Sequence, residues 1–462
     1  MMVPNILFIM LDQLRYDCVG FSRHYPVSTP NIDRLATEGA WFSNAYTPIP
    51  ICSPSRQALL NGRRPETFGA LWNFNNGLDI PALEPEEYAW PRDLAQHSYQ
   101  RSLIGKWHVH PDRSPVDYGY DAYVGFDGYT AMLTQAYPDV QYRNGFFGER
   151  NPIPVEHSET HWLADQACAA IQQLTRGQAP WYIQLNFNEP HPPCRPSGKF
   201  ADMYRPEDIE PWQAFNETFV DKPYIQKQQL YNWNIEDYTW EQWAPVVARY
   251  YGVISQVDDA IGKVLQALES AGAADNTMVI LTSDHGDMCG SHRMMDKHYV
   301  MYDDVVKVPL IIKHPGLVKQ GAVYDQFVYQ ALDLPPTILE MLGLDVPPFF
   351  HGRSLVPLLR NQEVADWRNA VVSTYNGQQF GLYTQRMLRT NSWKYVWNTT
   401  DVDELYNLTQ DPHELTNLIY DPGCVDVVQQ YRRALYDTLL AEGDGLVQSE
   451  WMRNQLVHNR KR

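Results

Sequence analysis

The stretch CSPSRQALLNG, residues 52–62, places a cysteine where a helix is expected to begin. Pro54 is typical of the first turn of a helix, and Gly62 is typical of the residue just after its end. On such a helix Cys52 and Arg56 are four residues apart and share one face. The free N–H groups and the dipole at that end favour negative charge. The pattern predicts either a stabilised oxyanion or thiolate at position 52, or a capped helix with an incidental cysteine.

Four further polar clusters each follow a short apolar run that is typical of a buried strand. In open α/β sheets, ligands bind in the crevice beyond the carboxyl ends of the strands, so we expect these clusters to converge. Two of them are acidic, which makes a metal site a better interpretation than unrelated caps and turns. The runs and clusters are ILFIML (6–11) before Asp12-Gln13, RSLIG (101–105) before Lys106-Trp107-His108, WYIQLNF (181–187) before Asn188-Glu189-Pro190-His191, and TMVILTS (277–283) before Asp284-His285-Gly286-Asp287.

The elements that must position these residues alternate between short strands and helices. This order predicts an α/β fold with a large, mostly parallel central sheet sandwiched by helices. Helices are expected over 31–39, with Asn31 as N-cap and Gly39 as stop, and over 246–272. The catalytic α/β domain is expected to span 1–365, with an irregular insertion at 192–245.

The texture of the chain changes after about residue 366. Strand-like pieces between 371 and 409 and a helix at about 424–442 predict a small α+β subdomain with an antiparallel sheet. We therefore expect a C-terminal subdomain and tail over 366–462.

The composition narrows the class of protein. The chain has 462 residues and a net charge of −18, which argues against nucleic-acid and anionic-membrane partners. Its 6 cysteines have no CxxC spacing, so neither a disulfide framework nor a zinc knuckle is predicted. The start of the chain lacks a positively charged leader, and its apolar run is too short for a signal peptide. We therefore expect a cytoplasmic protein, unless a leader has been removed.

The motifs occur in an order that resembles the type I formylglycine-dependent sulfatases of the alkaline phosphatase superfamily. Cys-x-Pro-x-Arg followed by Leu-x-x-Gly is the signature of that family, and the resemblance runs from Pro4 to about Leu418. It is carried, besides CSPSRQALLNG, by the early DQ, GKWH, NEPHPP, SDHGDMCGSHRMMDK, HGRSLVPLL and ELYNLTQDPHELTNL.

The resemblance implies that Cys52 is oxidised after translation to Cα-formylglycine. A formylglycine-generating or equivalent modifying enzyme is then a partner of the chain. One oxygen of the hydrated aldehyde attacks sulfur and expels the alcohol, and deprotonation of the other hydroxyl eliminates sulfate. A plain serine has no second hydroxyl with which to break the adduct.

The resemblance also implies a divalent metal. Its ligands would be Asp12, Gln13, Asp284, His285 and the modified Cys52. Oxygen-rich ligation favours Ca²⁺, while Mg²⁺ and Mn²⁺ stay open and the imidazole adds Zn²⁺ to the alternatives. Many sulfatases carry a second Asp at the Gln13 position and Asn at the His285 position. The Gln/His pair resembles the branch that holds phosphonate monoester hydrolases and several bacterial sulfatases.

Cationic side chains complete the implied site. By family position, Lys106 contacts the diol, His108 is the base for elimination, and Arg56 steadies the diol. His191 and Lys297 match residues that bind sulfate oxygens and assist the leaving group. Fixed cations suit a transition state that spreads negative charge over its oxygens. Four neighbours are expected to be structural: His110, His292, Arg293 and His298.

The substrate is less well defined by the sequence. LWNFNNGLD (71–79) lies where family members carry a pocket Asn, so Asn73, Asn75 or Asn76 is a candidate, with a structural loop as the alternative. The aromatic residues of 192–245 could stack on a sugar or aryl face, form a core, or contact a second subunit. The residues are Trp212, Tyr224, Tyr231, Trp233, Tyr238, Trp240 and Trp243.

Three functions compete. The first is hydrolysis of a small anionic sulfate monoester, of a sulfated carbohydrate or another organic sulfate. The second is a phosphonate monoester or phosphodiester hydrolase, which Gln13 and His285 favour and Lys106 with His108 disfavours. The third is a non-catalytic metal-binding protein. The oligomeric state stays open, a homo-oligomer included.

Overall fold

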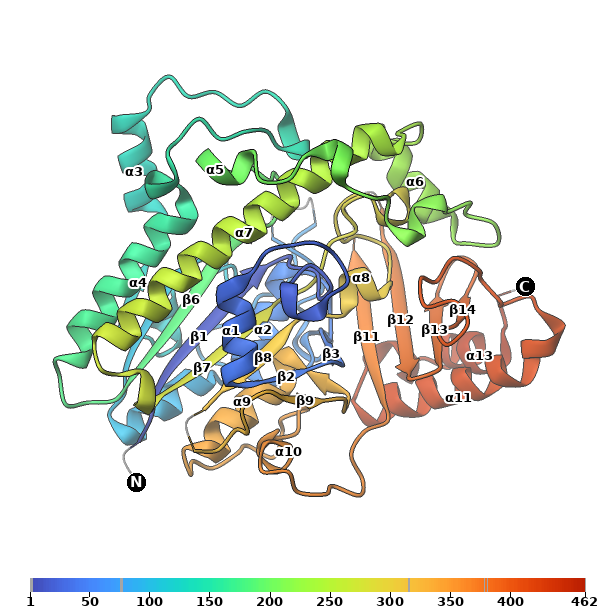
Figure 1. Cartoon of the computed structure of the whole chain (residues 1–462). Coiled ribbons are helices and arrows are strands. Elements are labelled where there is room, and N and C mark those ends of the chain that lie inside the picture. The colour runs from blue at the N-terminus through green and yellow to red at the C-terminus, as the bar shows by residue number, and fades with distance from the viewer. Residues whose placement is uncertain (1–2, 75–77, 315, 378, 380, 462) are drawn as a thin grey trace.

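An eight-stranded sheet forms the centre of the computed structural model, which describes residues 3–461 except 75–77, 315, 378 and 380. The strand order is β5-β4-β6-β1-β7-β8-β2-β9 (Figure 1). The strands from β5 to β7 are parallel, and β8 is antiparallel to both neighbours. The bounds are β1 Asn5–Asp12, β2 Ala40–Phe42, β4 Gln100–Gly105, β5 Ala122–Val124, β6 Trp181–Pro190, β7 Thr277–Ser283, β8 Leu310–Lys313 and β9 Ala322–Tyr324, with a separate short pair, β3 Ala45–Tyr46 and β10 Val328–Tyr329.

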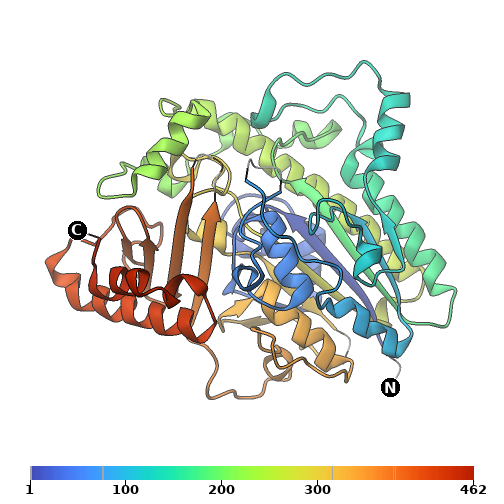
Figure 2. The same ribbon diagram turned by 180° about the vertical axis from the view of Figure 1, so that it is seen from behind.

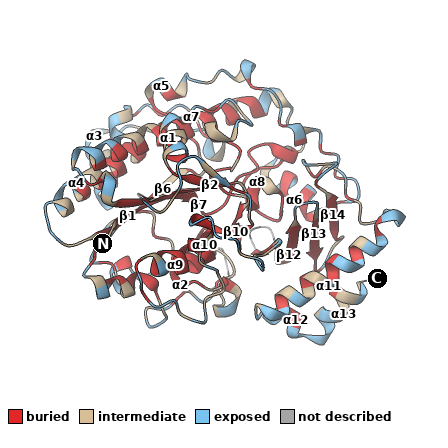
Figure 3. Cartoon of the chain, turned by 60° about the horizontal axis from the view of Figure 1, so that its bottom comes forward, coloured by how far each residue is buried: buried red, intermediate tan, exposed pale blue. Residues whose placement is uncertain are grey.

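Helices cover both faces of this sheet. The alternation of side chains along β1 sends Leu7 and Ile9 toward α1, α4 and α7, and Ile6 and Phe8 toward α2 and α9. Both faces are therefore apolar and buried, as Figure 3 shows. The predicted fold class is confirmed. The helices are α1 Pro30–Glu38, α2 Cys52–Asn61, α3 Asp127–Ala136, α4 Glu159–Thr175, α5 Gly198–Ala201, α6 Tyr224–Trp233, α7 Trp240–Ser270, α8 Asp303–Val306, α9 Gln330–Met341 and α10 Val356–Leu359.

A second sheet lies beside the first and forms a separate lobe in both Figure 1 and Figure 2. It is antiparallel, in the order β11-β12-β13-β14, as the sequence predicts. Two bonds tie its first strand to the loop before α2: Ser373 Oγ donates to Thr47 O (2.5 Å) and Thr374 N to Pro48 O (2.9 Å). The boundary between residues 365 and 366 stays a prediction. The elements are β11 Ala370–Gly377, β12 Tyr383–Thr390, β13 Trp393–Asn398, β14 Glu404–Asn407, α11 Val425–Ala441, α12 Gly445–Gln448 and α13 Glu450–His458.

The N-cap predicted for the first helix is wrong by two residues. The helix begins at Pro30 with Thr29 as N-cap, although Gly39 ends it as expected. Asn31 does not cap because its side chain is used elsewhere: Nδ2 donates to Asp258 Oδ2 on α7 (2.9 Å). A tertiary contact therefore outweighs the local preference of Asn for the cap position.

The insertion at 192–245 is more regular than predicted. It contains α5 and α6, and α7 begins at Trp240 after a capping box formed by Thr239 and Gln242. A buried ion pair between Lys222 and Glu217 anchors it.

The aromatic residues of this insertion divide among the three alternatives. Trp212 and Trp243 are core residues, whereas Tyr224 and Tyr231 are exposed. Trp233 packs on Phe146, with ring centroids 4.9 Å apart.

Within the described part of the chain, no helix combines the length and the apolarity that crossing a membrane requires.

Candidate active site

Cys52 is the first residue of α2 and is only 1% exposed. The chain enters the helix in an extended conformation at Ile51, and the helix ends at Gly62, whose φ of 75° is left-handed. All ten residues of α2 are buried, so the helix is held from every side. The predicted helix is confirmed, and its N-terminus presents position 52 to the carboxyl ends of the strands.

Arg56 joins two buried carboxylates beneath Cys52. Its Nη2 donates to Asp12 Oδ2 (2.9 Å), and its Nε donates to Asp284 Oδ2 (3.0 Å). Asp12 ends β1 and Asp284 follows β7, which pairs with β1 in parallel. One guanidinium therefore spans the ends of two neighbouring strands.

Asp12, Cys52, Asp284 and His285 form one group. A ligand atom from each can be chosen so that all four lie within 4.8 Å of one another. Cys52 Sγ lies 3.1 Å from His285 Nε2. His285 Nδ1 lies 2.9 Å from Gly286 O, and because a carbonyl only accepts, Nδ1 carries the hydrogen and Nε2 faces the group.

The charges in this group are incompletely balanced. Burial, together with the charge of Asp12, raises the pKa of Asp284 to about 6. Burial would also raise the pKa of Asp12, but Lys106, His191 and Arg56 hold it below its usual value. Two carboxylates and an imidazole around one point are a donor set that suits a divalent cation, which would relieve the strain on Asp284.

The same surroundings favour an anion at position 52. Burial would raise the pKa of the Cys52 thiol, but the charges of Lys297, Lys106 and His285 lower it well below its usual value. The position is thus preorganised for negative charge.

Lys106 and His108 reach the site from the loop after β4. Lys106 Nζ lies 2.7 Å from Asp12 Oδ2, and Asn186 Nδ2 on β6 donates to the Lys106 carbonyl (2.8 Å). His108, with a left-handed φ of 52°, hydrogen-bonds to Cys52, and burial lowers its pKa. A neutral imidazole beside position 52 can accept a proton there.

Lys297 joins the remaining residues. Its Nζ donates to Gln13 Oε1 (2.7 Å) and to His191 Nε2 (2.9 Å). Burial would lower the pKa of Lys297, but Asp296 and Cys52 raise it, so it stays a cation. Gln13 turns its amide toward Lys297 and does not contact Cys52 in any described hydrogen bond.

The structure separates the other sequence candidates from the site. Asn73 Oδ1 accepts from Ser53 N (2.9 Å), at the start of α2, whereas Asn75 and Asn76 lie outside the described residues. His292, Arg293, His110 and His298 have structural partners, as expected: Glu217, the Glu236 carbonyl, the N–H groups of Asp112 and Arg113, and Tyr375.

Three residues near the site were not predicted from the sequence. Asn186 holds Lys106, and Asp287 and Asp296 contact Gln13. Asp287 and Asp296 lie within the SDHGDMCGSHRMMDK motif, so their position three residues after Asp284 and one before Lys297 was the available signal.

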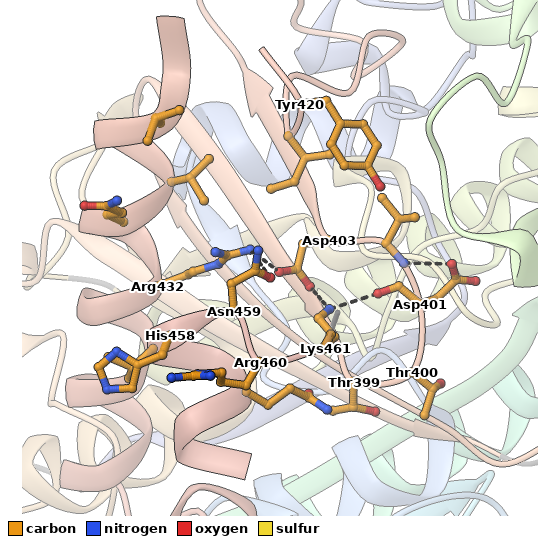
Figure 4. Close-up of a pocket in the computed structure, with 17 residues that line it drawn as sticks. Thr399, Thr400, Asp401, Asp403, Tyr420, Arg432, His458, Asn459, Arg460 and Lys461 are labelled. Atoms are coloured by element: carbon orange, nitrogen blue, oxygen red, sulfur yellow. Dashed lines mark hydrogen bonds and ion pairs between the residues drawn. The ribbon is translucent and has the colours of Figure 1, made fainter. Parts of the chain in front are cut away.

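A large cavity lies far from these residues, in the C-terminal subdomain (Figure 4). Its charged groups pair with one another: Arg432 Nη2 lies 2.9 Å from Asp403 Oδ2, and Lys461 also binds Asp403. It contains none of the clustered residues described above and is not a candidate for their chemistry.

Comparison with known proteins gives two family matches. The model of the sulfatase family matches residues 4–344, and the model of the N-sulphoglucosamine sulphohydrolase C-terminal region matches residues 290–440. The two matches overlap and together span both sheets.

Individual relatives are similar over nearly their whole length. An arylsulfatase of Clostridium perfringens (strain 13 / Type A) is 28% identical over 96% of this chain and 96% of its own. A choline-sulfatase of Rhizobium meliloti (strain 1021) is 28% identical over 92% and 84%. A phosphonate monoester hydrolase of Agrobacterium radiobacter has a solved structure that superposes with a TM-score of 0.81, at 26% identity over 95% of this chain and 96% of that one.

Proposed function

The chain belongs to the sulfatase family and is a sulfatase, and we propose that it hydrolyses small organic sulfate monoesters through a nucleophile derived from Cys52. One observation carries the proposal. A buried position at a helix N-terminus, Cys52, is surrounded by groups that stabilise an anion there, among them Lys106, His108 and Lys297. A core cysteine needs none of these cations.

The modification of Cys52 to formylglycine follows from the family and from this surrounding. The hydrated aldehyde supplies two hydroxyl groups at a point where the thiol now stands. His108, whose pKa is lowered by burial, accepts the proton of the hydroxyl that does not attack. Lys297, fixed between Gln13 and His191, supports the sulfate oxygens and the leaving group.

A divalent cation fits the residues present. Asp12, Asp284 and His285 would hold it, with Gln13 and position 52 as further ligands, and Ca²⁺ is the favoured ion. When bound, it lowers the pKa of the nucleophile and neutralises sulfate charge. Arg56 keeps Asp12 and Asp284 oriented for it.

The second candidate is hydrolysis of phosphonate monoesters or phosphodiesters on the same scaffold. Gln13 and His285 favour it, as does the likeness to the Agrobacterium radiobacter enzyme. Lys106 and His108 favour the sulfatase. The same fixed cations stabilise both kinds of transition state, so activity on both substrates is expected, with sulfate esters preferred.

The test is a kinetic comparison. We expect kcat/KM for 4-nitrophenyl sulfate to exceed that for a phenyl phosphonate monoester, and Lys106→Ala to reduce sulfate turnover more than phosphonate turnover. Sugar sulfates and choline sulfate then rank the natural substrate classes. A preference for phosphonates by orders of magnitude, unchanged in Lys106→Ala, would reject the first proposal in favour of the second.

A further inference from the structure

The amide of Gln13 has a buried partner for each of its groups. Its Nε2 donates to Asp287 Oδ2 (2.7 Å) and to Asp296 Oδ1 (2.9 Å), while its Oε1 accepts from Lys297 Nζ (2.7 Å). All four side chains are at most 3% exposed. Two carboxylates therefore take both amide hydrogens, and one ammonium takes the oxygen.

These partners fix which way the amide points. An ionised carboxylate only accepts hydrogen bonds, so Asp287 and Asp296 require the NH₂ group on their side. An ammonium only donates, so Lys297 requires the oxygen on the opposite side. Rotating the amide by 180° would break all three bonds, which leaves Gln13 Oε1 directed to the side of Lys297 and away from the carboxylates.

The backbone supports the same orientation. Gln13 follows β1 with a φ of 70°, in the left-handed region that residues other than glycine seldom adopt. Its N–H donates to Asp284 Oδ1 (3.1 Å), a carboxylate of the metal-binding group. The strained residue is thus held at its backbone by one carboxylate and at its side chain by two others.

We propose that Asp287 and Asp296 are positioning residues that clamp the Gln13 amide, so that this chain requires a neutral amide at position 13. The inference rests on the proposed function in taking Gln13 as a metal ligand. A carboxylate at position 13 would face two others at hydrogen-bonding distance, and its repulsion would displace the oxygen that Lys297 now holds. The clamp thereby limits the carboxylates facing the cation to Asp12 and Asp284.

Asp287 has a second bond that makes the clamp testable. Its Oδ1 accepts from Cys289 N (2.7 Å) while its Oδ2 accepts from Gln13, so both oxygens are used. An asparagine there has one oxygen and cannot serve both donors. Asp287→Asn alone should disturb Gln13. Combined with Gln13→Glu it should restore the match, because Asn Nδ2 then donates to the new carboxylate.

The experiment is a double-mutant cycle on the full chain with Gln13→Glu, Asp287→Asn and the pair. Gln256→Glu is the matched control. Gln256 is a fully buried glutamine on α7 whose Oε1 accepts from Ser197 N (2.7 Å), and within the described residues no carboxylate bonds to its amide. The readouts are the melting temperature of the metal-free protein and the Kd for Mn²⁺ by titration calorimetry.

We expect Gln13→Glu to lower the melting temperature more than Gln256→Glu does, and each single variant at the clamp to weaken Mn²⁺ binding about tenfold or more. The pair should recover at least half of the excess loss in melting temperature, since only Asp296 still repels. Losses that simply add, or a Gln13→Glu variant no worse than its control, would overturn the clamp. Because melting is measured without turnover, an inactive enzyme with strong coupling would reject the proposed function and leave the clamp standing.

Discussion

Replacing Arg56 by lysine keeps the charge and removes the fork that spans two strand ends. The guanidinium reaches Asp12 through Nη2 (2.9 Å) and Asp284 through Nε (3.0 Å), with both carboxylates fully buried. A lysine ammonium is a point donor on a flexible stem and cannot reproduce two fixed directions at once. We therefore expect Arg56→Lys to retain one of the two carboxylate contacts and to leave the other carboxylate without its donor.

The geometry sets the magnitude. A hydrogen bond to a charged group contributes about 1.5–3 kcal/mol, so losing one should cost about 2 kcal/mol of unfolding free energy. If the same contact orients the metal ligands in the transition state, kcat/KM falls tenfold for each 1.4 kcal/mol, or about 10- to 100-fold. Arg56→Ala leaves both carboxylates uncompensated and should cost about 3–5 kcal/mol.

The assay is denaturant unfolding together with kcat/KM on an aryl sulfate. Arg34→Lys is the matched control, because Arg34 bonds to Glu269 (2.8 Å) at the surface with 39% of its side chain exposed. An exposed pair of this kind contributes less than about 1 kcal/mol. Equal effects of Arg56→Lys and Arg34→Lys on both readouts would refute the reasoning that the fork organises the site.

Three further predictions concern charge, cation and clamp. Burial alone would raise the pKa of Glu217, but hydrogen bonding from His292 and the charge of Lys222 lower it to about 2 from the usual 4.5. Its contribution to stability is then fully present above pH 4.5 and is lost as the pH falls to 2, about 3 kcal/mol in all, so Glu217→Gln should flatten the acid limb of the unfolding free energy. Chelation by EDTA should abolish turnover and lower the melting temperature, and Ca²⁺ in large excess over its Kd should restore about 4 kcal/mol, while Asp284→Asn should remove this response. Lys297→Met should leave Gln13 Oε1 and His191 Nε2 without their donor and reduce kcat about 10²–10³-fold, a result that near-normal turnover would contradict.

The sequence predicted the positions at which the chemistry gathers because strand ends and helix starts are local patterns. The run before Asp12 and the run before Asp284 each read as a buried strand, and the parallel pairing of β1 with β7 brings both ends to one edge. Cys52 was placed at the start of a helix by Pro54 and Gly62 alone. The order of strands, and with it the convergence, needed the general behaviour of open α/β sheets.

Contacts between distant segments could not be predicted in the same way. The Gln13 amide is fixed by residues more than 270 positions away, and nothing near Gln13 announces them. Asn31 was expected to cap a helix and instead bonds to Asp258, because a partner 227 residues later outweighs a local preference. The insertion was read as irregular because α6 has no clear apolar stripe, and its tertiary partners stabilise it.

The central claim is that Cys52 acts after conversion to formylglycine, and mass spectrometry of the peptide that contains it tests this most directly. The chain should be produced together with a formylglycine-generating enzyme and compared with Cys52→Ala. We predict a peptide about 18 Da lighter than the cysteine form, in proportion to the turnover of aryl sulfate, and no turnover in Cys52→Ala. Full turnover by protein whose Cys52 is entirely unmodified, or by Cys52→Ala, would contradict the account.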